Sequence, residues 1–156
     1  DVLSSINEIN IATHSIDEFN KPYLIGLHIS EGTKLPSGEK ISELIDKLKN
    51  PKLLGVILSC VSPENYELNL NELKSFAVPF GFKLNGYLKT APLSKMNKTN
   101  NKNDFLQPNN FLGKRKDLSP EKMLEFVKGF KDSGATILGG CCETTPAHIK
   151  LFASLK

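Results

Sequence analysis

The sequence predicts an α/β protein in which parallel strands alternate with helices. Four short apolar runs are separated by segments of helical periodicity or by polar loops, and they lie at about residues 23–29, 53–58, 78–84 and 135–140. Runs that are apolar almost throughout are typical of strands buried on both faces of a parallel sheet. Their alternation with helices therefore favours one parallel sheet covered by helices.

The first part of the chain predicts a helix, a strand and a second helix. Apolar side chains recur every three or four positions over residues 2–19, and Asn20-Lys21-Pro22 ends this helix before the strand at 23–29. A loop rich in Gly and Pro then leads to a predicted helix over residues 39–49. Four apolar residues share one face of that helix, namely Ile41, Leu44, Ile45 and Leu48.

The middle of the chain predicts two further strands with a helix between them. The strand at 53–58 ends on Ser59-Cys60. Ser62-Pro63-Glu64 then predicts a helix start, with Ser as the N-cap and Pro at the first helical position. The third strand, at 78–84, ends on Asn85-Gly86.

The last part of the chain predicts a long loop, two helices and the fourth strand. Residues 89–116 are polar and rich in Asn and Lys, which predicts an extended surface loop. Ser119-Pro120-Glu121 repeats the capping pattern and starts a helix that ends at Ser133-Gly134. The strand at 135–140 precedes a final helix over residues 146–155, which begins at a proline.

Charge and hydropathy argue against nucleic acid and membrane partners. Twenty basic and seventeen acidic side chains give a formal net charge of +3. They are spread along the chain, and the short basic run Lys114-Arg115-Lys116 is expected to be solvated surface. No apolar run approaches the roughly 20 residues that span a bilayer, and the first residues lack the pattern of a secretion signal. We therefore expect a cytoplasmic protein.

Three cysteines carry the clearest chemical signal in the sequence. Cys60, Cys141 and Cys142 lie at or just beyond the carboxyl ends of predicted strands, the edge where parallel α/β folds build their active sites. We expect Gly139-Gly140 to let the chain leave strand geometry, so that two adjacent cysteines can face one point. Three thiolates around zinc would leave one tetrahedral position open, as in catalytic sites. The alternative is that all three are small buried core residues.

A family resemblance bears on these alternatives. The segment 139–149, Gly-Gly-Cys-Cys-Glu-Thr-Thr-Pro-Ala-His-Ile, resembles the GGCC signature of the homocysteine S-methyltransferase family, whose members continue with a Pro-x-His-Ile helix start. Residues 55–60 with Ser62-Pro63-Glu64 are similar to the family's strand that ends in a zinc cysteine. Residues 115–121 are similar to the entry of its penultimate helix. The resemblance covers residues 1–156.

The resemblance implies roughly the second half of a (β/α)₈ TIM barrel, strands five to eight, with Cys60, Cys141 and Cys142 as zinc ligands. Four strand–helix units are too few to close such a barrel, which needs about 250 residues. The implied reaction is transfer of a methyl group from a small donor to the thiol of homocysteine, giving methionine. Ser59 stands where the family often has Asn, and Glu143 where many members have Gly. No counterpart of the family's first strands lies within these residues, so only part of a substrate pocket is expected.

Other polar residues are weaker candidates. Asn85 is similar to the Asn of the family's Pro-Asn element and could contact substrate or metal, or could simply make a strand-end turn. Glu143 could favour a bound amino group, or could only interact with the dipole of the last helix. His28 is expected to be a core or rim residue rather than a ligand. His148 is expected to belong to a helix start, and His14 to lie on the surface.

Two rival hypotheses remain beside the S-methyltransferase. The chain could be a non-catalytic zinc- or thiol-binding half-barrel, and exposed strand edges would then make it self-associate. It could also hold a structural zinc whose fourth position is closed by Asn85, His28 or another group. A small thiol would compete for the fourth position only if that position is open.

Overall fold

The computed structural model describes residues 2–29, 31–88 and 112–155. Within these ranges it confirms an α/β fold with a four-stranded parallel sheet in the order β1-β2-β3-β4. The strands are β1 (Tyr23–Leu27), β2 (Leu53–Val61), β3 (Phe80–Leu84) and β4 (Ile137–Gly140). The helices are α1 (Ile6–Asp17), α2 (Pro63–Leu73), α3 (Pro120–Asp132) and α4 (Pro146–Ala153), with a 3₁₀ turn, η1, at Ile41–Leu44.

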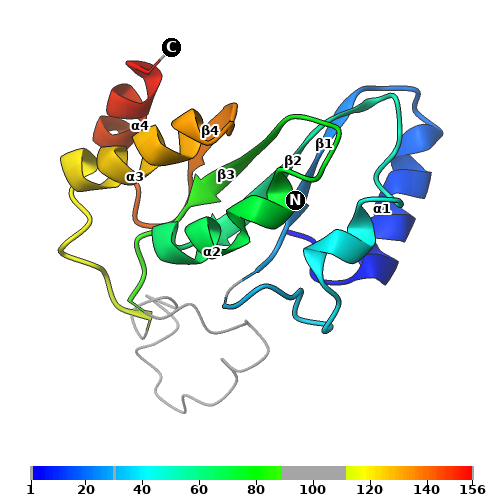
Figure 1. Ribbon diagram of the computed structural model, residues 1–156, viewed down its shortest axis with the longest axis horizontal. Helices are drawn as coiled ribbons and strands as arrows, with labels where there is room; N and C mark the ends of the chain where they lie inside the picture. The colour runs from blue at the N-terminus through cyan, green and yellow to red at the C-terminus, as the bar shows by residue number, and fades with distance from the viewer. Residues whose placement is uncertain (1, 30, 89–111, 156) are drawn as a thin grey trace, which may run out of the picture.

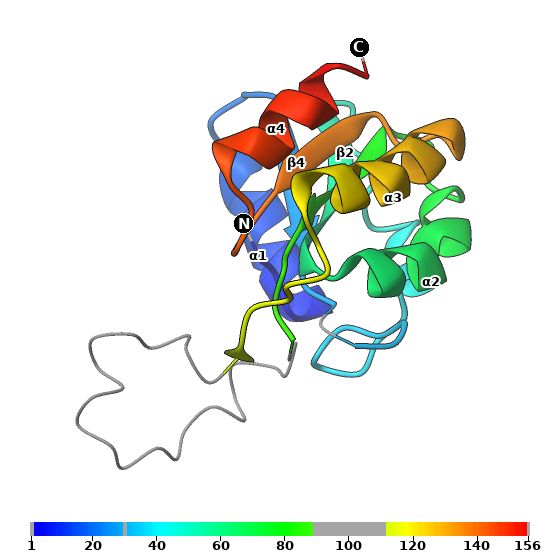
Figure 2. The same cartoon turned by 90° about the vertical axis from the view of Figure 1, so that its left-hand side faces the viewer.

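The hydrophobic core lies between the sheet and the helices. Helices α2 and α3 lie side by side against the sheet, while α1 lies near β1 and α4 packs beside β4 (Figures 1 and 2). Alternate residues of the strands enter this core, among them Ile25, Leu27, Val56, Leu58, Phe82 and Leu84. The residues between them face the opposite side of the sheet, because successive side chains of a strand alternate.

The predicted helix caps are confirmed. The Ser62 hydroxyl accepts a hydrogen bond from the Asn65 amide at 3.2 Å, and the Ser119 hydroxyl accepts one from the Lys122 amide at 3.2 Å. Both helices carry Pro at the first position, where no amide donor is needed. These local signals explain why α2 and α3 start where the sequence predicted.

The first helix is shorter than predicted, because α1 begins at Ile6 and not at residue 2. Ser5 caps it, and the residues before the cap run alongside β1 instead. Leu3 donates from its amide to the Gly26 carbonyl and accepts from the His28 amide, both at 2.8 Å. Pairing with the otherwise open edge of β1 satisfies more backbone groups than another helical turn would.

The predicted helix over residues 39–49 is wrong, since only η1 forms there and turns follow it. Ile41, Leu44 and Leu48 are nevertheless almost completely buried. The periodic spacing of apolar residues indicates which side chains are buried, but it does not require an α-helix. Here a 3₁₀ helix followed by turns buries the same side chains.

The strands also differ from the predicted ranges at their ends. β2 extends through Cys60 to Val61, whereas β3 begins only at Phe80, after Pro79. The predicted loop at 89–116 falls largely outside the described residues. Its final described part is not wholly irregular, because Lys114 forms an antiparallel bridge with Tyr87. Among the described helices, none is both long enough and apolar enough to cross a membrane.

Candidate metal centre

The structure brings the three cysteines together at the carboxyl edge of the sheet. The Cys142 sulfur lies 3.9 Å from the Cys60 sulfur and 3.8 Å from the Cys141 sulfur, and all three lie within 4.8 Å of one another. Each cysteine is half-buried. Residues 82 positions apart in the chain thus form one compact sulfur cluster.

Cys60 reaches the cluster because β2 bulges at that residue. Ser59 pairs with Lys83 and Val61 pairs with Leu84, so Cys60 is an extra residue with no partner in β3. Its φ angle is +58°, in the left-handed region that a residue with a side chain rarely occupies. A bulge re-aims the side chain that it carries. Here it turns the Cys60 thiol toward the end of β4.

Cys141 and Cys142 share a tight turn directly after β4. The Cys141 carbonyl accepts a hydrogen bond from the Thr144 amide at 3.2 Å and another from the Thr144 hydroxyl at 2.6 Å. Glu143 has a φ angle of +63°, which lets the chain reverse within this turn. The turn takes Cys142 out of strand geometry, so both sulfurs can face the same point.

The expected role of Gly139-Gly140 is therefore wrong in its mechanism. Neither glycine is among the residues with positive φ, and both lie within regular β4. Gly140 is needed for space: a Cβ atom there would lie 2.9 Å from the Thr144 Cβ atom. A Cβ atom added at Gly139 would lie 3.2 Å from the Phe82 carbonyl oxygen. Close packing, rather than backbone freedom, explains the pair.

Asn85 lies against the cluster and holds the Cys60 backbone. Its side chain is almost completely buried. The amide nitrogen donates to the Cys60 carbonyl at 2.6 Å and lies 3.6 Å from the Cys60 sulfur, while the amide oxygen accepts from the Tyr87 amide at 3.2 Å. The strand-end turn expected of Asn85 is present, and the same side chain borders the Cys60 sulfur.

Tyr87 was missed by the sequence interpretation. Its side chain is 7% exposed. Burial raises its pKa well above the ordinary value, and hydrogen bonding with the Cys142 side chain raises it further. The phenol therefore stays protonated beside Cys142. The only signal in the sequence is an aromatic residue two positions after the strand-end Asn85.

Glu143 lies two residues before Thr145, the N-cap of α4. Its carboxylate forms an ion pair with the Lys114 ammonium at 3.0 Å. Arg115 is also paired: it contacts Glu64 at 2.7 Å and Asp117 at 2.6 Å. The basic run thus binds carboxylates of its own chain.

The histidines differ in their surroundings. Nδ1 of His148 accepts from the Thr145 amide at 3.0 Å, so this buried histidine helps to start α4 as predicted. His14 is exposed on α1. His28 lies beyond β1, and burial lowers its pKa, with the Ser59 backbone and Cys141 among its neighbours. His28 thus lies near the rim of the cluster.

The sulfur cluster fits a tetrahedral metal ion. Zn–S bonds of about 2.3 Å would place the sulfurs about 3.8 Å apart, close to the separations of 3.8 and 3.9 Å from Cys142. Hydrogen bonding between Cys60 and Cys141 lowers the pKa of Cys141 to about 5 and raises that of Cys60 above its ordinary value. Three thiolates repel one another, so a cation is needed for all of them to be ionised together.

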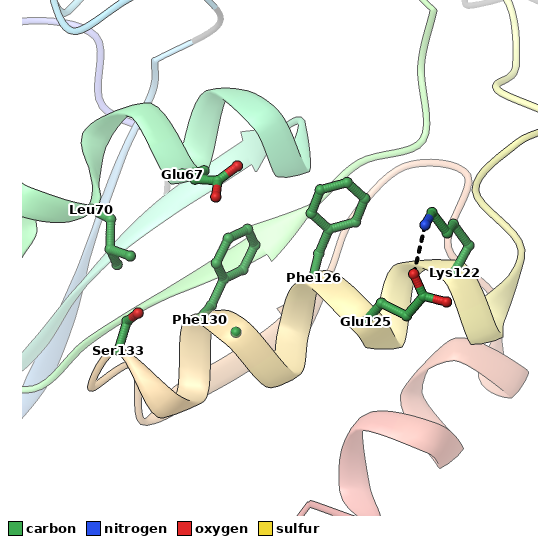
Figure 3. Close-up of a pocket in the computed structure, with 8 residues that line it drawn as sticks. Glu67, Leu70, Lys122, Glu125, Phe126, Phe130 and Ser133 are labelled. Carbon is green, nitrogen blue, oxygen red and sulfur yellow. Dashed lines mark hydrogen bonds and ion pairs between the residues drawn. The ribbon is translucent and has the colours of Figure 1, made fainter.

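Two surface cavities lie on other parts of the molecule. One, of about 350 Å³, is a groove between α2 and α3 (Figure 3). Its lining includes Phe126 and Phe130, together with the ion pair between Lys122 and Glu125. The second, of about 500 Å³, lies between β4 and α4 and includes Leu138 and Ile149. No cysteine lines either cavity.

The fold and the cluster together define an α/β protein with three cysteines gathered at the carboxyl ends of parallel strands. The family model described as homocysteine S-methyltransferase matches residues 1–155. The chain therefore belongs to the homocysteine S-methyltransferase family.

Two relatives of this chain are each named homocysteine S-methyltransferase 1. The protein from Saccharomyces cerevisiae is 28% identical over 144 residues, which is 88% of this chain and 40% of that protein. The protein from Arabidopsis thaliana is 28% identical over 133 residues, which is 79% of this chain and 34% of that protein. The chain therefore spans less than half the length of these relatives.

Crystal structures of the homocysteine methyltransferase MmuM from Escherichia coli have the same fold. The metallated form matches with a TM-score of 0.70 at 16% identity, covering 99% of this chain and 43% of that one. The apo form also matches with a TM-score of 0.70 at 16% identity, and the match covers 100% of this chain and 48% of that chain. MmuM is a TIM barrel, so the four strand units described here have the fold of part of such a barrel.

Proposed function

We propose that this chain carries the metal centre of a zinc-dependent methyltransferase that transfers a methyl group to the thiol of homocysteine. The observation that supports this most directly is the sulfur cluster, in which three Sγ atoms lie within 4.8 Å of one another. Membership of the homocysteine S-methyltransferase family supports the substrate. The chain spans less than half of its relatives, so other parts of a complete barrel would contribute to the pocket.

In this proposal Cys60, Cys141 and Cys142 hold the metal. Zinc bound there would supply the positive charge that lowers the pKa of a thiol in the fourth position, so that homocysteine reacts as a thiolate near neutral pH. The homocysteine sulfur forms a bond to the methyl carbon, and the bond between that carbon and the donor breaks. The electron pair of the broken bond leaves with the donor, and methionine is the product.

Residues around the cluster position the reacting groups. Asn85 donates to the Cys60 carbonyl and borders the Cys60 sulfur, so we expect its amide to lie beside a bound thiol. The Glu143 carboxylate is one-third exposed and already binds an ammonium, that of Lys114. We assign it to the cationic group of a substrate, either the homocysteine ammonium or a positively charged methyl donor.

The experiment that tests the function measures zinc content under reducing conditions. We expect about one zinc ion per chain, and we expect Cys60→Ala, Cys141→Ala and Cys142→Ala each to abolish stoichiometric binding. Ser15→Ala is the matched control, because Ser15 is exposed on α1. In cobalt-substituted protein, addition of homocysteine should change the absorption of the metal.

The outcomes separate the three hypotheses. Stoichiometric zinc whose coordination shell responds to homocysteine supports the methyltransferase. A zinc ion that homocysteine and other small thiols leave unchanged indicates a closed structural site. A folded protein without zinc would mean that the three cysteines are only packed side chains, and the proposal would be wrong.

A further inference from the structure

Three polar side chains form a row across the sheet, directly below the sulfur cluster. Ser59 pairs with Lys83, and Lys83 pairs with Gly139. His28 follows Leu27, whose partner is Leu58, so His28 lies level with Ser59. We call His28, Ser59 and Lys83 the polar row.

The polar row lies on the face of the sheet opposite the hydrophobic core. Leu27, Leu58 and Phe82 immediately precede its members, and all three belong to the core against the helices. Alternation along each strand therefore directs the polar row to the other face, which becomes the interior of a barrel. Barrel interiors are usually filled by branched apolar side chains, so a lysine and a histidine here need an explanation.

The polar row has unused hydrogen-bonding capacity. The Ser59 hydroxyl and Nδ1 of His28 are both buried, and neither has a hydrogen-bond partner among the residues that the structure describes. Over the same ranges no carboxylate forms an ion pair with Lys83. Buried polar groups are normally satisfied, so the Ser59 hydroxyl and the His28 ring, beside the part-buried Lys83, are suited to a polar ligand.

Gly139 gives the lysine the space to cross this face. A Cβ atom at Gly139 would lie only 3.4 Å from Cγ of Lys83, so the aliphatic stem of Lys83 runs over the glycine. Lys83 pairs with Gly139, which lies two residues before Cys141, so the lysine side chain starts next to the strand that leads into the cluster.

The spacing between the polar row and the cluster fits an amino acid with a thiol. Asn85 and Cys141 lie just beyond the ends of β3 and β4, two residues after Lys83 and Gly139, and two residues at strand spacing rise about 6.6 Å. Three carbon atoms separate the sulfur of homocysteine from its carboxylate carbon, which is a comparable reach. An ammonium and a hydroxyl donor match a carboxylate in charge and in hydrogen bonding.

We propose that the polar row binds the α-carboxylate of the thiol substrate, with the Lys83 ammonium as its cationic partner and Ser59 and His28 as hydrogen-bonding neighbours. This inference rests on the proposed function, because it assumes that a thiol substrate occupies the cluster. It adds a specificity determinant: the site selects amino-acid thiols over thiols that lack a carboxylate.

The test compares two thiols in zinc-loaded, full-length protein by calorimetric titration. One is homocysteine, and the other is 3-aminopropane-1-thiol, which is homocysteine without its carboxylate. We expect Lys83→Met to weaken homocysteine binding by about 10- to 100-fold, the usual effect of losing one charge-assisted hydrogen bond. Binding of 3-aminopropane-1-thiol should stay within about twofold, and Lys83→Arg should restore most of the homocysteine affinity.

Lys128 provides a matched control for Lys83. Lys128→Met removes an exposed lysine of α3 and should change neither affinity. Equal weakening of both thiols by Lys83→Met would show that Lys83 only offsets the charge of the sulfurs, and the inference would be overturned. An unchanged homocysteine affinity would overturn it as well. If neither thiol binds the unsubstituted protein, the proposed function fails, and this inference fails with it.

Discussion

At the scale of single residues, the cluster depends on two backbone positions in the left-handed region. Cys60 and Glu143 both have positive φ angles without being glycine, at +58° and +63°. Such conformations cost free energy, and they persist only where surrounding contacts enforce them. Asn85 is one such contact, because it bonds to the Cys60 carbonyl from the neighbouring strand.

Asn85 allows a prediction that joins stability to metal binding. Asn85→Ala removes the donor to the Cys60 carbonyl and the acceptor for the Tyr87 amide, and leaves both buried groups without this partner. We expect a loss of about 1–3 kcal/mol in the free energy of unfolding, measured by urea titration. Zinc affinity should fall by about 10- to 100-fold, as for other groups that orient metal ligands. Unchanged zinc affinity would show that the Cys60 bulge does not need Asn85.

Gly140 and Gly129 form a matched pair for a second prediction. Gly140→Ala should destabilise the protein by about 1–3 kcal/mol, because the new methyl group meets Thr144 inside the turn. Gly129 lies in α3 with open space where a Cβ would be, so Gly129→Ala should stabilise by up to about 1 kcal/mol through helix propensity. Urea unfolding of both variants measures the difference. Similar effects at the two positions would argue against close packing at the turn.

At the scale of elements, Arg115 joins the segment before α3 to the start of α2. Its guanidinium contacts Glu64 in the first turn of α2 and Asp117 two residues further on, and its side chain is only 18% exposed. The Arg115 amide also donates to the Gly86 carbonyl at 2.9 Å. The segment that carries Lys114 is therefore held beside the sulfur cluster by both backbone and side chain.

This contact predicts a pH dependence of stability. Hydrogen bonding to Arg115 lowers the pKa of Asp117, so its stabilising effect is complete above the unfolded pKa, near 3.9, and is lost as the pH falls through the lowered value. Asp117→Asn should lower the midpoint of thermal unfolding at pH 7, with a difference that shrinks below about pH 4. Asp132→Asn, an exposed change in α3, is the control. A difference independent of pH would mean that the carboxylate charge is not involved.

At the scale of the whole molecule, the sheet has one edge that is partly covered and one that is open. Leu3 pairs with part of the β1 edge. On its outer side β4 has no strand partner among the described residues, and an apolar cavity of about 500 Å³ lies between it and α4. Exposed strand edges beside apolar surface favour association with further strands.

We therefore expect this 156-residue chain to self-associate when it is studied alone, through the β4 edge. Ile149 lines the cavity beside β4 and is 44% exposed, so Ile149→Lys should shift the chain toward the monomer in sedimentation velocity experiments. Leu68 on α2 is 60% exposed and lies outside that cavity, so Leu68→Lys is the control. Equal effects of both substitutions would point to non-specific hydrophobic association instead.

The sequence by itself determined the parallel α/β fold, because buried strands are apolar throughout and Ser-Pro-Glu caps act locally. It also placed the three cysteines at strand ends, and their clustering follows once the strands are parallel and adjacent. Only the tertiary structure decided how the sulfurs converge. The Cys60 bulge, the turn at Glu143 and the packing of Thr144 over Gly140 depend on neighbouring strands.

The polar row likewise exists only through strand register, since no local pattern shows that His28, Ser59 and Lys83 lie side by side. The predicted helix at 39–49 is wrong for a related reason. The spacing of apolar residues indicates which side chains are buried, but packing against the rest of the fold decides the backbone conformation.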